Sequence, residues 1–420
     1  MADYIDKVNF YNEGGGLQKS VPIKDSDTAS SVASLTTKVS TNTNNISSLT
    51  KVVDTLSNKT NNFINNTFPA YKQDVAISFA DLGGSTSDDG TKNGEILENA
   101  LTGNITLFIP SGTYKIKGNI HINTRAIITG NGTLTMVDGT IVCSAQCKIC
   151  DIVLRSNANR AVVEMKEGSE HSEISGVWFD GNHDVSILLN NSFCIISNCV
   201  FYKPNRAIVL LGQCINTIIT SNYIYAGVVG ISIEKDTNNL RAEGILICNN
   251  GIFEGTYAIS CTNSVLNMNI SNCIIDQQTN GASINISGDG VTVDNMQIST
   301  TYFGATTNGI LIGSTCEKAT ITACTFNDIK NNCILAVGAN GKFNQLSIGQ
   351  CRMRSGNTCI SASDSRQELV TVDSCTLDSG IYPSIVINQA GSSGFISHSL
   401  WTGSLNIAST IVKENNNFSS

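Results

Sequence analysis

Basic side chains are too few and too scattered in this sequence to form a cationic surface. Lysine and arginine supply 26 positive charges against 34 negative charges, which leaves a net charge of -8, and only 14% of the residues are charged. Because phosphate contacts depend on clustered lysine and arginine, this balance argues against nucleic-acid binding. No basic run is present, so we expect no attachment to an anionic membrane.

Long apolar stretches are also missing. No segment approaches the roughly 20 consecutive apolar residues that cross a bilayer, so no membrane insertion is expected. The sequence starts with Met-Ala-Asp-Tyr and has no apolar leader. This predicts a protein that folds in a reducing cytosol and is not exported through a cleavable signal.

Cysteine is frequent, but the pattern needed for a zinc site or a disulfide framework is missing. The 15 cysteines are an odd number, so at least one thiol is unpaired, and a chain of this length has a core that needs no disulfides. Cys143, Cys147 and Cys150 lie close together, yet no second cluster completes a zinc site. We therefore predict buried free thiols, no bound metal and no cofactor.

What the sequence does contain is a hexapeptide that recurs every 22 to 28 residues. Its first position is apolar and its third is small or typical of turns. Its fourth and sixth positions differ by two, which is the side-chain period of a strand. Units of this length bury their apolar faces only by stacking on their neighbours. The copies begin at Ile149, Ile174, Ile196, Ile219, Ile247, Ile270, Val293, Ile321, Ile348, Val372 and Ile396.

The repeat predicts an all-β fold, a right-handed, single-stranded parallel β-helix of about 12 turns. Positions one and four do not share the strand period, so the chain must bend between them. Asn198, Asn249, Asn272 and Asn295 are expected at this bend, because asparagine tolerates left-handed backbone. Leucine-rich repeats have a similar length but need a helical return, and helical periodicity is absent. Cysteines of the fourth position should stack inside the coil, namely Cys199, Cys273, Cys324, Cys351 and Cys375.

Residues 32–63 follow a different period, of seven. β-branched residues at one heptad position and leucine three residues later are typical of a coiled coil. The residues between them are mainly serine, threonine and asparagine, which are weak helix formers, so association must stabilise the helix. Taken alone, the heptads favour two strands, and the polar Asn42 and Thr60 would select the register. The heptad residues are Val32, Leu35, Val39, Asn42, Ile46, Leu49, Val53, Leu56, Thr60 and Phe63.

Residues 77–117 resemble the start of the pectate-lyase-like β-helices found in bacteriophage tailspikes and pre-neck appendages. The shared pattern is an aspartate and a glycine, a second acidic segment that ends in glycine, a short capping helix, an apolar strand and Pro-x-Gly-x-Tyr. The resemblance extends over the repeat to residue 405. It implies a virion appendage, commonly a homotrimer, that binds or cleaves host surface glycans. The motif residues are Asp81, Gly83, Asp88, Asp89, Gly90, Pro110, Gly112 and Tyr114.

Repeat, heptads and resemblance together predict five segments. They are a virion-anchoring segment (1–28), a coiled coil (29–72), an N-terminal cap (73–118), the β-helix (119–405) and a C-terminal tail (406–420). The predicted partners are two further copies of the chain, a phage structural protein bound through residues 1–28, and a host surface polysaccharide. The assembled protein would lie in the virion.

Carboxylates on adjacent turns are the first candidates for catalysis, because glycoside hydrolases use two carboxyl groups about 5 to 10 Å apart. Asp180 and Asp184 form one candidate pair, and a polar corner held by Asp180 is the alternative. Glu254 and Asp276 lie on successive turns and form a second candidate pair, with solvated wall charges as the alternative. Pectate-lyase chemistry is doubtful, because no acidic cluster on stacked strands could hold Ca²⁺.

Aromatic, histidine and arginine side chains are the candidates for ligand contact. Trp178 could pack against a sugar, and His183 next to it could transfer a proton. Arg352 and Arg354 could hold an acidic sugar through bidentate hydrogen bonds, or could be solvated wall residues. The favoured interpretation is a spike that binds host glycan. The alternatives are a glycan depolymerase, either hydrolase or lyase, and a purely structural virion decoration. Further stacking platforms are possible at Tyr223, Tyr225 and Tyr257.

Overall fold

The computed structural model describes residues 7–11, 17–22, 26–62, 76–278, 280–414 and 417–418. The chain divides into two units, Met1–Tyr71 and Lys72–Ser420.

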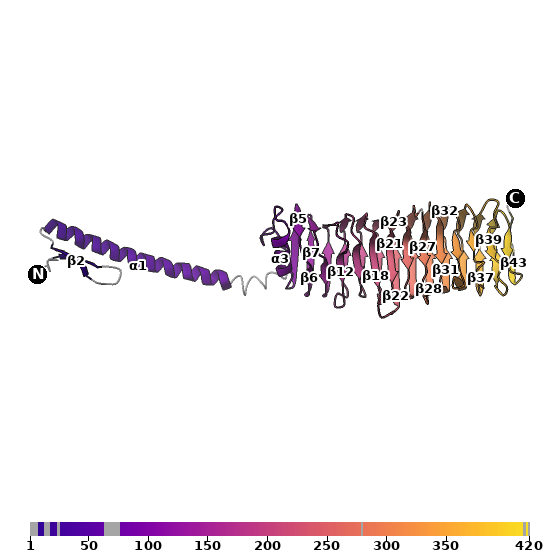
Figure 1. Ribbon diagram of the computed structural model, residues 1–420, viewed down its shortest axis with the longest axis horizontal. Helices are drawn as coiled ribbons and strands as arrows, with labels where there is room; N and C mark the ends of the chain where they lie inside the picture. The colour runs from indigo at the N-terminus through magenta and orange to yellow at the C-terminus, as the bar shows by residue number, and fades with distance from the viewer. Residues whose placement is uncertain are drawn as a thin grey trace. The chain divides into compact units, whose positions relative to one another are not determined.

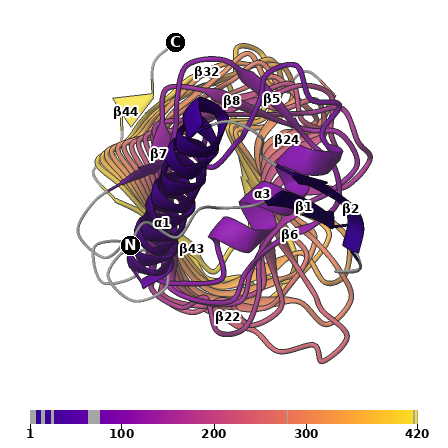
Figure 2. The same ribbon diagram turned by 90° about the vertical axis from the view of Figure 1, so that its left-hand side faces the viewer.

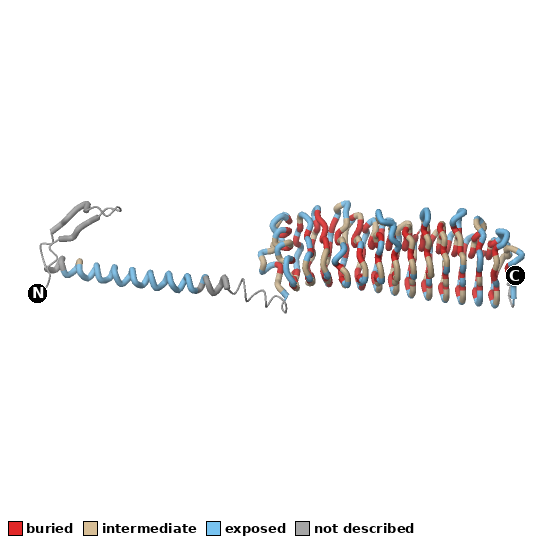
Figure 3. The backbone as a smooth tube through the Cα atoms, turned by 90° about the horizontal axis from the view of Figure 1, so that it is seen from below, coloured by how far each residue is buried: buried red, intermediate tan, exposed pale blue. Residues whose placement is uncertain are grey.

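The first unit contains an antiparallel hairpin and one long helix. The hairpin pairs β1 (Lys7–Tyr11) with β2 (Leu17–Pro22), and the helix is α1 (Ser26–Asn62). The predicted helix is therefore confirmed up to Asn62, while residues 63–72 of the predicted coiled coil lie outside the described residues. Six large apolar side chains of α1 are between 54% and 68% exposed, namely Leu35, Val39, Ile46, Leu49, Val52 and Val53. Exposed residues predominate along the described part of the helix (Figure 3). Pairing of α1 with other copies, and the trimer, remain predictions.

The second unit is a parallel β-solenoid of the right-handed type, in which three sheets run along the coil (Figure 1). Across the described residues, thirteen turns contribute one strand to each sheet, compared with about 12 predicted from the spacing of the repeats. All neighbouring strands of these sheets pair in parallel, and the register is residue over residue except for a shift between Phe326 and Ile329 where β32 pairs with β35.

The fifteen-stranded sheet consists of β3 (Ile77–Ser78), β4 (Ile105–Ile109), β7 (Ala126–Gly130), β10 (Cys147–Cys150), β13 (Glu173–Ser175), β16 (Ile195–Ser197), β19 (Ile218–Thr220), β22 (Ala242–Cys248), β25 (Val265–Ser271), β28 (Thr292–Ser299), β31 (Thr315–Thr322), β34 (Lys342–Gly349), β37 (Leu369–Asp373), β40 (Gly394–Ser397) and β43 (Ile411–Glu414).

The fourteen-stranded sheet consists of β5 (Thr113–Ile116), β8 (Thr133–Met136), β11 (Val153–Ser156), β14 (Trp178–Asp180), β17 (Val200–Tyr202), β20 (Tyr223–Tyr225), β23 (Gly251–Phe253), β26 (Ile274–Asp276), β29 (Tyr302–Gly304), β32 (Thr325–Ile329), β35 (Arg352–Ser355), β38 (Thr376–Asp378), β41 (Leu400–Trp401) and β44 (Asn417–Phe418).

The thirteen-stranded sheet consists of β6 (Ile120–Ile122), β9 (Ile141–Cys143), β12 (Ala161–Met165), β15 (Val185–Leu189), β18 (Arg206–Leu211), β21 (Val229–Glu234), β24 (Tyr257–Cys261), β27 (Ala282–Ile286), β30 (Asn308–Ile312), β33 (Ile334–Ala336), β36 (Ile360–Ser361), β39 (Ile385–Ile387) and β42 (Leu405–Ile407).

The hexapeptide spans the corner between the fifteen-stranded and fourteen-stranded sheets. Its third residue adopts a left-handed backbone conformation in every one of the eleven copies, which turns the chain from one sheet into the next. One predicted copy was placed five residues too early: Ile298, not Val293, pairs with Ile270 and Ile321. The left-handed corner residues are Asp151, Gly176, Asn198, Ser221, Asn249, Asn272, Thr300, Ala323, Gln350, Ser374 and His398.

The fourth and sixth positions of the hexapeptide point into the core, as predicted. Phe179 stacks on Phe201 with ring centroids 4.9 Å apart, and Phe303 stacks on Phe326 at 4.5 Å. All fifteen cysteines lie within the described residues as free thiols, and fourteen of them are buried. Burial raises the pKa of Cys199 to about 12, so this thiol stays neutral and acts as a small apolar side chain.

Helix α3 (Thr91–Ala100) packs against the first turn of the solenoid and covers its end (Figure 2). Its fully buried Asn93 accepts a hydrogen bond from Ser85 N and donates to the carbonyls of Ser85 and Lys115. Asp88 accepts hydrogen bonds from Gly90 N and Asn93 N, which satisfies donors at the start of the helix.

Strands of the coil extend into the predicted cap and the predicted tail. In the segment 73–118, the first complete turn begins at β4. In the segment 406–420, β43 pairs with β40 and β44 pairs with β41. The described part of that segment therefore continues the coil.

Candidate functional site

The outer face of the fourteen-stranded sheet carries a row of aromatic side chains, and three of them, Trp178, Tyr202 and Tyr223, are exposed. Its strands from β14 to β29 are each three residues long, so the middle residue points inward and the first and third point outward. Trp178 and Tyr223, both first residues, are 50% and 46% exposed. The outward aromatic residues of this sheet between β14 and β29, called here the aromatic stripe, are Trp178, Tyr202, Tyr223, Tyr225, Phe253 and Tyr302.

Three rings form a compact cluster at the centre of the stripe. The ring centroids of Tyr223 and Phe253 are 5.0 Å apart, those of Tyr225 and Phe253 are 5.3 Å apart, and the Tyr225 hydroxyl donates to the Tyr223 hydroxyl at 3.1 Å. Gly251 makes this packing possible, because a Cβ there would lie 2.8 Å from the Phe253 ring. The pKa of Tyr225 is raised, chiefly by its hydrogen bond with Tyr223, with a smaller contribution from the charge of Glu254.

Asp276 lies on the next strand of the same face. A Cβ at Gly304 would lie 2.9 Å from Asp276 Oδ1 and 2.8 Å from the Tyr302 hydroxyl, so both groups gather over this glycine. Asp276 Oδ1 is buried and makes no hydrogen bond. Buried polar atoms in native proteins are nearly always hydrogen-bonded, so an unsatisfied carboxylate oxygen calls for an explanation.

Glu254 is exposed at the turn that follows β23, where its backbone is left-handed. Its backbone N donates to the carbonyl of Asp276, and buried Gln278 donates to the carbonyls of both residues, at 3.1 and 2.8 Å. Two residues predicted to act together thus lie on adjacent turns and share one anchoring amide. None of the ion pairs in the described chain involves either carboxylate.

The other predicted carboxylates, Asp180 and Asp184, lie apart from each other, and each forms an ion pair with an arginine. Asp180 Oδ2 lies 2.8 Å from Arg155 Nε on the outer face of the fourteen-stranded sheet. Asp184 lies beyond the next corner of the coil, and its Oδ2 lies 2.8 Å from Arg206 Nη2. Because Arg206 also contacts Glu234 at 3.0 Å, Asp184 belongs to a separate ionic cluster.

His183, a predicted ligand contact, lies inside the wall of the solenoid. Its side chain is fully buried, its Nε2 lies 2.7 Å from Ser186 Oγ, and its Nδ1 lies 3.2 Å from the carbonyl of Ser156. Burial lowers the pKa of His183, so the ring is held neutral inside the wall.

Arg352 and Arg354 do share the outer face of the fourteen-stranded sheet with Trp178 and Asp276. Both are exposed on β35, three strands beyond β26, and Arg354 Nε lies 3.8 Å from Asp378 Oδ2. Adjacent strands are about 4.8 Å apart, so the arginines lie roughly 14 Å from Asp276 along the sheet.

Sequence reasoning missed half of the stripe, namely Tyr202, Phe253 and Tyr302. The available signal was the register of the repeat: each of them is the fifth or seventh residue counted from the start of a hexapeptide. When the fifth and seventh residues of every copy are aligned, they form two outward columns. Aromatic residues are concentrated in these columns between β14 and β29.

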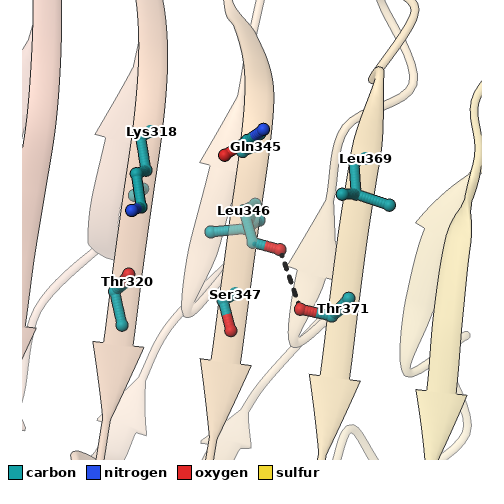
Figure 4. A pocket seen from close by; sticks show the side chains of 8 residues that line it. Lys318, Thr320, Gln345, Leu346, Ser347, Leu369 and Thr371 are labelled. Atoms are coloured by element: carbon teal, nitrogen blue, oxygen red, sulfur yellow. Dashed lines mark hydrogen bonds between the residues drawn. The ribbon is translucent and has the colours of Figure 1, made fainter.

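Surface hollows exist elsewhere. One of about 100 Å³ lies on the fifteen-stranded sheet between Lys318, Gln345 and Leu369 (Figure 4). Another of about 170 Å³ lies near Arg125, Lys148 and His171. Neither contains a predicted site residue. In the part of the chain that the structure describes, no three histidine, cysteine or acidic side chains are placed to hold a metal, and no helix is suited to crossing a membrane.

No model of a known protein family matches the sequence, and no curated protein matches it either. Among solved structures, the catalytic unit of a GH87 α-1,3-glucanase from Streptomyces thermodiastaticus has a TM-score of 0.52 at 12% identity, over 83% of this chain and 69% of that chain. Tailspike protein 3 of bacteriophage CBA120 has a TM-score of 0.36 at 12% identity, over 87% of this chain and 68% of that chain. At such identities the first likeness shows the fold alone.

Proposed function

We propose that this protein is a phage virion appendage that binds host surface glycan along the aromatic stripe. The observation that carries the proposal is the central cluster of Tyr223, Tyr225 and Phe253 beside the unsatisfied carboxylate of Asp276. Sugar rings present an apolar C–H face and hydroxyl donors at their edges. Carbohydrate sites accordingly combine aromatic surfaces with a few fixed polar groups.

A second copy of the chain is the competing occupant of this face. The tyrosine hydroxyls and the unpaired carboxylate favour a hydroxyl-rich ligand, since an interface core is depleted of charge. If the stripe instead joins copies of the solenoid, Tyr223→Ala will lower the sedimentation coefficient of the protein.

The binding test uses purified protein on an array of bacterial capsule and cell-wall polysaccharides. Tyr223→Ala should weaken binding at least about tenfold, in line with the loss of one aromatic anchor. Tyr382→Ala is the matched control, because Tyr382 is 45% exposed, like Tyr223, but lies outside the stripe. Equal affinities for the two variants, or no binding by the wild type, would refute the proposal.

Depolymerisation is a second candidate, favoured by one observation. The ion pairs of the described residues include neither Glu254 nor Asp276. The two residues lie on adjacent turns, where strands about 4.8 Å apart suit the separation of a hydrolase carboxylate pair. Bound glycan would then shorten on incubation, and Asp276→Asn would abolish the shortening. If the glycan binds but its chain length does not change, the protein binds glycan without cleaving it.

Assembly as a homotrimer through α1 is part of the proposal, supported by the exposed heptad residues of that helix. Analytical ultracentrifugation should give three times the mass of the chain, and deletion of residues 26–62 should give one. Deletion of residues 1–28 should leave the assembly intact but absent from virions. Continued incorporation into virions would show that residues 1–28 are not the anchor.

A further inference from the structure

The central part of the aromatic stripe carries one charged side chain in its two outward columns. Between β20 and β29 those columns hold four aromatic residues, two glycines, Ile274 and Asp276. Glu254, at the adjoining turn, adds a second negative charge. The described residues of these four strands therefore offer a ligand negative potential and no positive charge.

The positive charges of this face lie beyond the central part. Lys203 Nζ is 5.0 Å from the centroid of Tyr202, at the strand that precedes β20. Arg352 and Arg354 lie on β35, two strands beyond β29. Neither group pairs with Asp276, whereas Asp180 and Asp184 are both neutralised by arginine. Asp276 thus stands out as an uncompensated charge against an aromatic surface.

We infer that the central part of the stripe selects an uncharged glycan and excludes polyanionic ones such as polyuronates. This rests on the proposed glycan binding and adds the class of ligand. The accessible part of the Asp276 carboxylate accepts a hydrogen bond from a sugar hydroxyl, while the rings of Tyr223 and Phe253 pack on the apolar faces of sugar rings. A carboxylate on the ligand would be brought close to Asp276 and Glu254 with no nearby cation, and like charges at that range repel strongly in a partly desolvated site.

The test compares a neutral glucan with a polyuronate of the same chain length by isothermal titration calorimetry. The wild type should bind the glucan at least about tenfold more tightly at low salt, and added salt should narrow this ratio because it screens the repulsion. Asp276→Asn should weaken glucan binding, tighten polyuronate binding and so reduce the ratio. Tyr382→Ala should leave both affinities unchanged.

Two further variants keep the outcomes distinct. If Asp276→Asn lowers the melting temperature too far for titration, Glu254→Gln replaces it, since Glu254 is exposed, and the ratio should fall in the same direction. Arg352→Ala combined with Arg354→Ala reports on anion binding at β35. The inference is overturned if the wild type binds polyuronate as tightly as glucan, and if this binding is lost in Tyr223→Ala but kept in the double arginine variant. Glycan binding by the stripe would still stand in that case. Binding of neither probe class by the wild type, with no glycan bound on the array, refutes both.

Discussion

Two walls of the same coil have different surfaces around a common interior. One turn places Tyr223 outward on the fourteen-stranded sheet and Ser232 outward on the thirteen-stranded sheet, and the first is 46% exposed while the second is 3% exposed. Inside, Ile224 and Ile231 are both fully buried. Because the core is the same behind both walls, the fold does not require the aromatic residues. The row of aromatic residues from β14 to β29 is the feature on which the proposed glycan binding rests.

The largest test of this comparison removes a core ring and a wall ring in parallel. Phe326→Ala should lower the free energy of unfolding by about 3 to 5 kcal/mol, because it opens a cavity beside Phe303. Tyr225→Ala should cost less than about 1 kcal/mol, since its ring remains in contact with water. Denaturant unfolding monitored by circular dichroism measures both values. A cost for Tyr225→Ala as large as that for Phe326→Ala would make the stripe part of the stabilising core.

A smaller effect is expected at the polar part of the interior. Buried Asn222 donates to Asn250 Oδ1 and to the carbonyl of Ile196, and it accepts from Cys199 N. Asn222→Ala removes the side-chain partner of Cys199 N and of the Ile196 carbonyl, and it should lower the free energy of unfolding by about 1 to 3 kcal/mol. Thr376→Ala, at an exposed outward position, is the control and should be close to neutral. Similar stabilities of the two variants would show that the buried amides contribute nothing.

The smallest expected effect on stability comes from an exposed carboxylate, that of Asp373, which accepts hydrogen bonds from neighbouring side chains. Hydrogen bonds from Ser397, His398 and Ser374 hold the pKa of Asp373 at about 2, below its usual value of 3.8. A lowered pKa in the folded state stabilises the protein above about pH 4, and this stabilisation is lost as the pH falls toward 2. Melting temperature should therefore fall less steeply between pH 4 and pH 2 in Asp373→Asn than in the wild type. Identical slopes would count against this role.

Much of the fold follows from the sequence, and the errors have a physical cause. The hexapeptide frame predicts the corner and the inward columns, because strand period and left-handed corner residues are local properties. The slip at Val293 arises from β28, which contains an internal left-handed residue, Asn295, that imitates the true corner at Thr300. In such a long strand, an apolar residue followed by a left-handed asparagine resembles the start of the hexapeptide, five residues before the true start.

The site was harder to predict, because neighbours in sequence lie on different walls. Asp180 and Asp184 are four residues apart, but a corner places them in separate ion pairs, and His183 between them turns inward. Conversely, Trp178, Asp276 and Arg352 are far apart in sequence and share one sheet face. Only the register of all the turns, with Ile298 in its correct place, reveals that Tyr302 lies in the outward column of Gly251 and Ile274, next to the column that holds Phe253.

The most direct test of the central claim uses the two tryptophans of the chain. Trp178 is 50% exposed at one end of the stripe, whereas Trp401 is 9% exposed in the core. Acrylamide quenching of tryptophan fluorescence is measured with and without saturating glycan, in the wild type and in Trp178→Phe. We expect bound glycan to reduce acrylamide quenching in the wild type and to leave quenching unchanged in Trp178→Phe. Undiminished quenching of Trp178 while glycan is bound would contradict the claim that the stripe is the binding surface.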